Sequence, residues 1–361
     1  MFKQTALMLI LVSMLNFLCT GCAEKPAQIQ VFSRENFIMD TVIRISVYSA
    51  DPKLGQAALD AAFAEFSRID RLADRFAESA THKAESSDVI RINLSAARVP
   101  VSVSEDTMVM LEKSVNIAAL SEGAFDVTIA PVVDIWGFKD AEHQIPGGQE
   151  LKEKLALVDY KRIRTDREQK TVFLPEDGTA VDLGGIAKGY ATDMAVRELR
   201  RLGITSAMIN AGGNVYALGA KPDGTLWRVG IQDPRDSEKI IAVLSVKDTA
   251  VVSSGDYERY FMLDGIRYHH ILDPATGEPA RKMISATVLN SSAADADALS
   301  TAVFVLGPER GAALIRELSA TQAVFVDNEQ TISYSRSLEE QIEFLDQEHY
   351  PLAADEESGG Y

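Results

Sequence analysis

The sequence of 361 residues contains only two cysteines, Cys19 and Cys22, both near its start. The rest of the chain therefore has no thiol for a disulfide, a thiolate metal site or a cysteine nucleophile. Basic residues are also scarce, because 36 Lys and Arg stand against 53 Asp and Glu, for a formal charge of −17. This balance argues against nucleic acid as a partner and against binding of an anionic membrane through the protein surface.

Familiar nucleotide and zinc motifs are missing as well. The chain contains neither the GxGxxG fingerprint nor the GxxxxGK[ST] phosphate loop. Its five histidines show no HxxxH or HExxH spacing, and no cysteine is available to complete a zinc site. Any nucleotide or metal chemistry must therefore use other arrangements of residues.

The first residues predict an export signal. Lys3 precedes the apolar run ALMLILVSMLNFL, which is too short to span a membrane comfortably. The run ends in LCTGC, which resembles a bacterial lipobox with Cys22 as the lipidated residue; an ordinary signal peptide cleaved nearby is the alternative. On the lipobox interpretation, residues 1–21 are a signal peptide and 22–33 a tether. The protein is then lipid-anchored at the periplasmic face of a bacterial membrane, and Ala23 after the cysteine favours the outer membrane.

Hydrophobic periodicity predicts a mixed α/β (α+β) protein. Residues 43–48 (IRISVY) alternate as a strand does, whereas apolar residues at three- and four-residue steps over 59–76 indicate a long amphipathic helix. A second helix is expected over 108–118, and short strands with glycine turns dominate from residue 172 onward. Because no regular βαβ period is present, we expect mixed sheets flanked by helices in one compact two-lobed unit.

The limits of this unit are expected at residues 34 and 335. After Arg336 the chain has eight acidic residues and no basic one. Segments of such composition bury little apolar surface, and we therefore expect 336–361 to form an acidic, partly disordered tail.

Two segments contain residues suited to phosphate and metal chemistry. Residues 182–190 (DLGGIAKGY) lead through two glycines into a predicted helix, whose backbone N–H groups suit a phosphate, with Lys188 adding a charge. A purely structural glycine turn is the alternative. In a helix after residue 294, Asp297 and Thr301 lie four apart and share one face. Their oxygens would suit Mg²⁺, although a carboxylate near a helix start also simply favours the helix dipole.

Three further segments are ambiguous by themselves. His269 and His270 adjoin the turn DPATG, where a histidine is either structural or catalytic. The segment 209–213 (INAGG) repeats the glycine theme, and Tyr257 in GDYERY either packs in the core or stacks on a planar ring. A phosphate-binding turn and a Mg²⁺ site together are typical of phosphoryl transfer.

Nine segments, in order, resemble the ApbE family of flavin-transferring lipoproteins. They span roughly residues 30–325 and are Met39-Asp40-Thr41, SDVIRIN (87–93), SEGAFDVTIAPVVDIWGF (121–138), VDLGGIAKGYATD (181–193), INAGGNVYALG (209–219), WRVGIQDP (227–234), SSGDYERYF (253–261), HHILDPATGEPA (269–280) and ADALSTAVFVLG (296–307). The resemblance implies an ApbE-like fold and an FAD:protein FMN transferase. Such an enzyme uses Mg²⁺ and FAD as substrate, transfers FMN to a Thr or Ser hydroxyl through a phosphodiester bond, and releases AMP. The implied acceptor is a flavoprotein subunit of membrane electron transport.

The resemblance also implies roles for individual residues. The metal ligands would be Asp297, Thr301 and the backbone carbonyl of Ala187. His270 would activate the attacking hydroxyl or orient the phosphate, and Asp297 is a second catalytic candidate. The residues expected to line the FAD cleft, besides His270, are Met39, Asn93, Phe125, Asp126, Thr128, Lys188, Gly212, Gly213 and Tyr257.

One departure and two alternatives accompany the resemblance. Asp40 stands where the family commonly has Gly, which bears on one wall of the cleft. A periplasmic FAD pyrophosphatase, yielding FMN and AMP, is one alternative function. A flavin-binding lipoprotein without catalytic activity is the other, and it would release no AMP.

Overall fold

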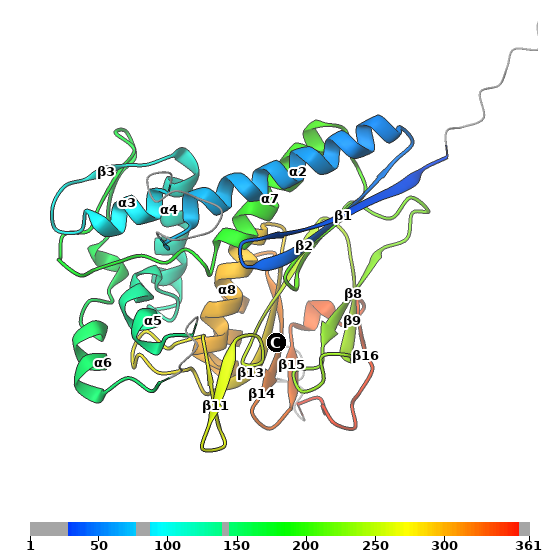
Figure 1. Cartoon of the computed structure of the whole chain (residues 1–361). Coiled ribbons are helices and arrows are strands. Elements are labelled where there is room, and N and C mark those ends of the chain that lie inside the picture. The colour runs from blue at the N-terminus through cyan, green and yellow to red at the C-terminus, as the bar shows by residue number, and fades with distance from the viewer. Residues whose placement is uncertain (1–27, 77–86, 139–143, 354–361) are drawn as a thin grey trace, which may run out of the picture.

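The computed structural model describes residues 28–76, 87–138 and 144–353. Its centre is an eight-stranded antiparallel sheet in the order β1-β2-β6-β7-β10-β13-β14-β15 (Figure 1). The strands are β1 (Gln30–Ile38), β2 (Thr41–Ser49), β6 (Ala207–Ala211), β7 (Asn214–Leu218), β10 (Thr249–Gly255), β13 (Met283–Asn290), β14 (Gln322–Asp327) and β15 (Ile332–Tyr334).

Helices cover one face of this sheet. They are α2 (Pro52–Ala73), α7 (Ala187–Arg201), α8 (Ala293–Leu306) and α9 (Pro308–Glu317). The long helix α2 begins where the Asp51 side chain accepts a hydrogen bond from the Lys53 N–H at 2.9 Å, with Pro52 at its first position. Its buried residues Phe63 and Phe66 belong to the same hydrophobic cluster as the alternate residues of β2. The sheet thus offers one apolar face to an amphipathic helix.

A smaller antiparallel sheet covers the opposite face. It has the order β16-β9-β8, with β8 (Trp227–Gln232), β9 (Ile240–Val246) and β16 (Ile342–Phe344). Strand β10 contributes to the hydrophobic clusters on both faces of the central sheet. Val252 belongs to the cluster under the helices and Val251 to the cluster under the small sheet. The central strands are therefore apolar on both sides, as expected for a sheet covered on both faces.

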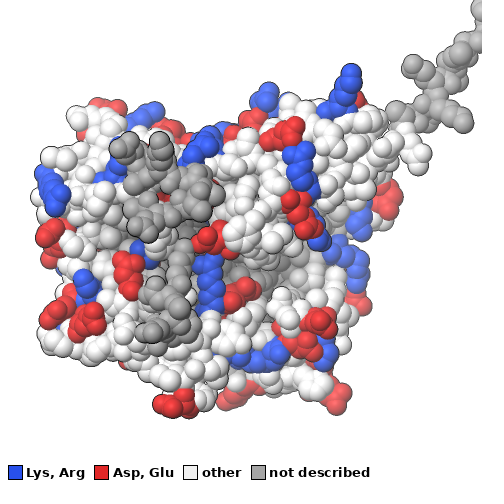
Figure 2. Space-filling model, viewed as in Figure 1, with Lys and Arg blue, Asp and Glu red and all other residues white. Residues whose placement is uncertain are grey.

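A second lobe lies beside these layers, on the left in Figure 1. It contains α3 (Asp88–Leu94), α4 (Glu105–Leu120), η2 (Val127–Ile129), α5 (Ala130–Trp136), α6 (Gly148–Leu155), η3 (Tyr160–Arg162) and the sheet of β3 (Val101–Ser102), β4 (Arg164–Asp166) and β5 (Thr171–Phe173). The hairpin of β11 (Tyr260–Leu263) and β12 (Ile266–His269) packs against this lobe, since Tyr268 lies 5.8 Å from Trp136 between ring centroids. Acidic and basic side chains are interspersed over the face seen in Figure 2.

The expected mixed α/β architecture is confirmed, and two segment limits need correction. The expected tether overlaps β1, which starts at Gln30. The expected acidic tail is folded as far as Ala353, because it supplies η4 (Arg336–Leu338), β16 and the buried Tyr350, 2% exposed. The tail's last residues, 354–361, and the predicted signal peptide lie outside the described residues. Among the helices of the described residues, none combines the length and the apolar character that a membrane span requires.

Candidate active site

The site is built where α7 and α8 meet at their N-terminal ends. Gly189 makes this approach possible, because a Cβ there would lie 2.1 Å from the Ala293 carbonyl oxygen. Asp193, one turn further along α7, caps α8 by accepting hydrogen bonds from the N–H groups of Ala293 at 2.7 Å and Ala294 at 3.0 Å. The glycine-rich segment before α7 therefore has a packing role besides any ligand role.

Asp297 occupies the buried side of this junction and is 4% exposed. Its Oδ2 accepts the N–H of Gly189 at 2.9 Å, and its Oδ1 accepts the side-chain amide of Asn214 at 2.9 Å. The ammonium of Lys188 lies 3.9 Å from Oδ1. Burial raises the pKa of the Asp297 carboxyl, and Lys188 and the two hydrogen bonds oppose that rise.

Two hairpin turns lie side by side at the edge of the site. Met39 and Asp40 join β1 to β2 with φ values of 57° and 56°, and Gly212 and Gly213 join β6 to β7 with φ values of 61° and 94°. Positive φ at both positions is typical of a two-residue type I′ hairpin. A Cβ on Gly212 would lie 2.3 Å from the Thr41 Oγ1, so glycine is required there by contact as well as by φ. Asp40 adopts the left-handed conformation although it has a side chain.

Thr301 and Ala187 supply further oxygens on the same two helices. Thr301 is half-buried, and its Oγ1 makes two long contacts with described residues, 3.5 Å to the Asp297 carbonyl oxygen and 3.4 Å to the Ser254 Oγ. Ala187 is the first residue of α7, two positions before Gly189. The predicted ligands Ala187, Asp297 and Thr301 are thus on the two elements that form the junction.

The two histidines at the end of β12 have different environments. His269 is 2% exposed, its Nε2 lies 2.7 Å from the Ala280 carbonyl oxygen, and its Nδ1 accepts the Ile271 N–H at 3.3 Å. These contacts fix a neutral ring, and burial lowers the His269 pKa to about 4. His270 is half-buried, and burial followed by the charge of Arg259 lowers its pKa to about 3, with a smaller contribution from Lys188. His269 is structural, and His270 is the histidine within the electrostatic reach of Lys188.

Four residues expected in the cleft have structural roles in the second lobe. The Asp126 carboxylate accepts the N–H and hydroxyl of Thr128 at 2.8 and 2.6 Å, and the N–H of Tyr160 at 2.8 Å. The Asn93 side chain bonds both backbone groups of Val181, at 3.0 and 2.8 Å. Phe125 packs on Gly185, where a Cβ would lie 2.9 Å from its ring. The polar groups of Asn93, Asp126 and Thr128 are engaged within the protein.

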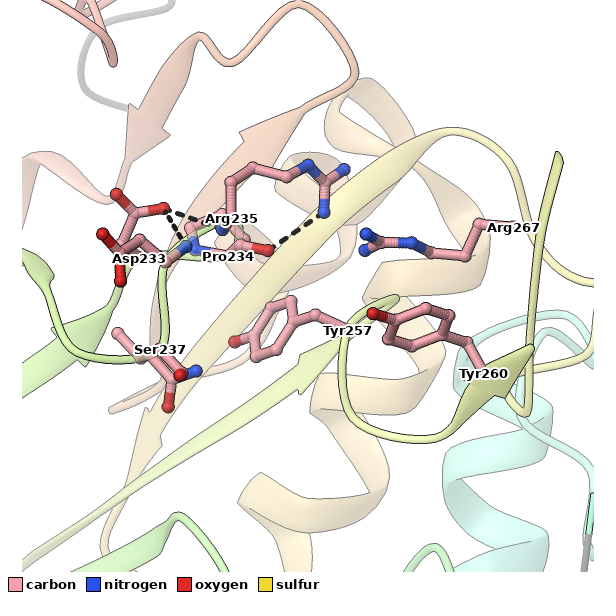
Figure 3. Close-up of a pocket in the computed structure, with 9 residues that line it drawn as sticks. Asp233, Pro234, Arg235, Ser237, Tyr257, Tyr260 and Arg267 are labelled. Carbon is pink, nitrogen blue, oxygen red and sulfur yellow. Dashed lines mark hydrogen bonds between the residues drawn. The ribbon is translucent and has the colours of Figure 1, made fainter. Parts of the chain in front are cut away.

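Tyr257 lines a pocket of about 230 Å³ near the β11–β12 hairpin (Figure 3). In this pocket Arg235 binds both oxygens of Asp256, at 2.7 and 3.0 Å, and Arg267 binds the same carboxylate at 3.0 Å. The Arg267 guanidinium also lies 4.2 Å from the centroid of the Tyr260 ring. The ion pair of Arg235 with Asp256 therefore connects the chain just after β8 to the GDYERY segment.

A family model described as the ApbE family matches residues 39–325. The chain belongs to the ApbE family. It is 33% identical over 336 residues to a Treponema pallidum (strain Nichols) protein named FAD:protein FMN transferase, covering 89% of this chain and 91% of that protein. It is 30% identical over 307 residues to an Escherichia coli (strain K12) protein of the same name, with coverage of 82% and 86%.

Solved ApbE structures have the same fold. The ApbE protein from Thermotoga maritima superposes with a TM-score of 0.78 at 33% identity, covering 85% of this chain and 98% of that one. The flavin transferase ApbE from Vibrio cholerae gives 0.76 at 27% identity, with coverage of 88% and 100%. The ApbE-like architecture expected from the sequence is confirmed by both.

Two further residues at this junction, Asn214 and Asp193, are not among the site residues that the sequence predicts. They lie inside the motifs INAGGNVYALG and VDLGGIAKGYATD. Their partners are distant in sequence, 83 residues from Asn214 to Asp297 and 99 from Asp193 to Ser292. A polar residue directly after a glycine turn was the only available signal for Asn214.

Proposed function

We propose that this protein is a Mg²⁺-dependent transferase that moves the FMN part of FAD to a Thr or Ser hydroxyl of an acceptor protein and releases AMP. The observation that carries the proposal is Asp297, a buried carboxylate with two hydrogen-bond donors and the Lys188 ammonium beside it. Relatives named FAD:protein FMN transferase support the flavin chemistry.

The residues around Asp297 fit a magnesium ion that binds together with a phosphate-bearing substrate. Within the described ranges, no three His, Cys, Asp or Glu side chains gather into a metal-binding group. Mg²⁺ commonly uses one or two carboxylates, with waters and substrate phosphates as its other ligands. Asp297, the Thr301 Oγ1 and the Ala187 carbonyl would hold the ion. When bound, it would neutralise charge that develops on the phosphates.

His270 is proposed to accept the proton of the attacking hydroxyl. Its Nδ1 lies 3.3 Å from the Arg259 carbonyl oxygen, which can only accept, so this contact requires the proton on Nδ1 and leaves Nε2 with a lone pair. Because its pKa is lowered to about 3, the imidazole is neutral at pH 7. A neutral ring with an unprotonated Nε2 can take a proton as the hydroxyl attacks, although the low pKa makes it a weak base.

The proposed step replaces the phosphoanhydride bond of FAD by a phosphate ester bond to the acceptor. The acceptor oxygen forms a bond to the FMN phosphorus, while the phosphoanhydride bond to the AMP phosphate breaks. The hydroxyl proton passes to His270, and the electron pair of the broken bond leaves with AMP. Lys188 offsets negative charge on the phosphates, so alignment and charge neutralisation carry most of the catalysis.

The location and the partners are part of the same proposal. The LCTGC segment supports lipidation of Cys22, which lies outside the described residues, and anchoring at the periplasmic face of a bacterial membrane. A lipid-anchored transferase would meet acceptors in that membrane. Electron-transport subunits with a Thr or Ser acceptor are therefore the proposed partners.

The test compares two carboxylates of α8. Asp297→Asn keeps the shape of the side chain but removes the charge, whereas Asp295→Asn removes a carboxylate that pairs with Lys113 at 2.7 Å and lies outside the site. Soluble protein starting at Ala23 is incubated with FAD, Mg²⁺ and a periplasmic and membrane extract. Protein-bound flavin fluorescence is read on a denaturing gel, and AMP by chromatography.

We expect a fluorescent band for wild type and Asp295→Asn, loss of the band with EDTA, and at least a 100-fold lower rate for Asp297→Asn. Equal amounts of free FMN and AMP without a band would instead identify a pyrophosphatase that uses water in place of the acceptor hydroxyl. Stoichiometric FAD binding with no AMP would identify a binding protein. Full activity of Asp297→Asn would contradict the assignment of the site.

A further inference from the structure

Asn214 is the only side chain that donates a hydrogen bond to Asp297 among the hydrogen bonds of the described residues. It is 6% exposed and is the first residue of β7, immediately after the Gly212–Gly213 turn. The turn reverses the chain, and the pairing of Ala211 with Asn214 fixes where β7 begins. The amide is thereby directed from the central sheet to α8, where it meets the Asp297 Oδ1 at 2.9 Å.

The two donors to Asp297 come from different layers of the fold. The Gly189 N–H in α7 holds Oδ2, and the Asn214 amide in β7 holds Oδ1, each at 2.9 Å. The terminal torsion of an aspartate is broad, so one donor leaves the carboxylate plane free to rotate, whereas two donors on separate elements fix it. Lys188, at 3.9 Å on a flexible stem, lies beyond hydrogen-bond distance and does not replace either donor.

The chemistry of an amide suits this position. Asn is a neutral donor, so it orients the carboxylate while leaving its full negative charge for a cation or for Lys188. A lysine would neutralise that charge, and a second carboxylate would repel it. The open lone pairs of Asp297 then point in one fixed direction.

We propose that Asn214 is a positioning residue that fixes the plane of the Asp297 carboxylate for cation binding. The inference rests on the proposed function, because it assigns to Asp297 the role of a metal ligand. Groups that hydrogen-bond to a metal-ligating side chain typically change metal affinity by about 10–100-fold when they are removed.

The experiment measures cation binding rather than turnover. Asn214→Ala removes the donor, and Asn214→Thr fills the strand position with a side chain too short to reach Asp297. Asn290→Ala is the matched control, because this partly buried asparagine also donates its amide to a side chain, Thr321 Oγ1 at 2.8 Å, at the end of β13. Mn²⁺ is titrated by EPR in the presence of FAD, and urea unfolding is measured for each variant.

We expect the apparent Kd for Mn²⁺ to rise at least 10-fold in both Asn214 variants and by less than twofold in Asn290→Ala, even where the losses of stability are similar. Wild-type Kd values for both Asn214 variants, measured on folded protein, would overturn the positioning role alone. Absence of Mn²⁺ binding by the wild type with FAD would overturn the metal assignment and, with it, this inference.

Discussion

Replacement of Gly189 by alanine tests the packing on which the site depends. The added Cβ would lie 2.1 Å from the Ala293 carbonyl oxygen, 2.6 Å from its carbon and 2.8 Å from the Ala294 Cα. All three atoms are backbone atoms of α8, so no side chain can rotate away. To bring the first contact even to 3.0 Å, the two helices must separate by about 0.9 Å.

The energetic cost follows from this separation. Forcing an extra methyl group into a close-packed interface costs about 1–3 kcal/mol. Moving α7 also lengthens the 2.9 Å hydrogen bond from Gly189 to Asp297, and a poorly satisfied buried acceptor costs about 1–3 kcal/mol more. The better helix propensity of alanine returns about 1 kcal/mol. We therefore expect Gly189→Ala to lower the free energy of unfolding by about 3 kcal/mol.

Urea unfolding monitored by circular dichroism measures this change, and the flavin-transfer assay is run below the unfolding transition. Gly148→Ala is the matched control, because a Cβ at this helix start would meet no atom within 4 Å. It should leave stability and transfer unchanged. A Gly189→Ala protein within about 0.5 kcal/mol of wild type and equally active would refute the close approach of the two helices.

Three other substitutions test the structure around the site. Burial lowers the pKa of His269 from 6.5 to about 4, so the unfolded chain binds more protons than the folded chain between these pH values. The free energy of unfolding of the wild type should therefore fall by about 3 kcal/mol from pH 7 to pH 4 relative to that of His269→Gln, as measured by urea titrations. Asp193→Ala removes the acceptor of two N–H groups in the first turn of α8 and should cost about 2 kcal/mol by the same measurement, whereas Asp223→Ala, at an exposed turn, should cost little. Trp136→Phe loses the 2.8 Å hydrogen bond to the Gly277 carbonyl and should cost about 1–3 kcal/mol; a neutral result would contradict its burial at 1% exposed.

Local patterns predicted the elements that have strong periodicity. The three- and four-residue steps of α2 and the alternation of β2 were visible because each has one apolar face. The strand β16 was missed, because three residues in an acidic segment are too few to show a period of two. Its pairing with β9, about a hundred residues earlier in the chain, is a tertiary contact that composition does not reveal.

The sequence could relate the residues of the candidate site only in part, for a similar reason. Asp297 and Thr301 lie on one helix, so spacing alone relates them. Gly189 and Asn214 reach Asp297 from 108 and 83 residues away, and only the fold brings them together. Conversely, Asp126 lies in a motif expected to line the FAD cleft, yet its carboxylate oxygens accept hydrogen bonds from the N–H groups of Thr128 and Tyr160. A sequence does not distinguish a polar residue that binds a ligand from one that binds its own backbone.

The hydrogen bonds of three carboxylates supply that distinction. Asp193 accepts three hydrogen bonds, from Ser292, Ala293 and Ala294, and Asp126 also accepts three. The charges of the buried Asp126 and of the partly buried Asp193 are therefore satisfied within the protein, as a structural carboxylate requires. Asp297 is 4% exposed but accepts only two hydrogen bonds from the described residues, and the Lys188 ammonium lies 3.9 Å away. A carboxylate that retains acceptor capacity while buried is costly unless a ligand completes it, and this difference separates Asp297 from its structural neighbours.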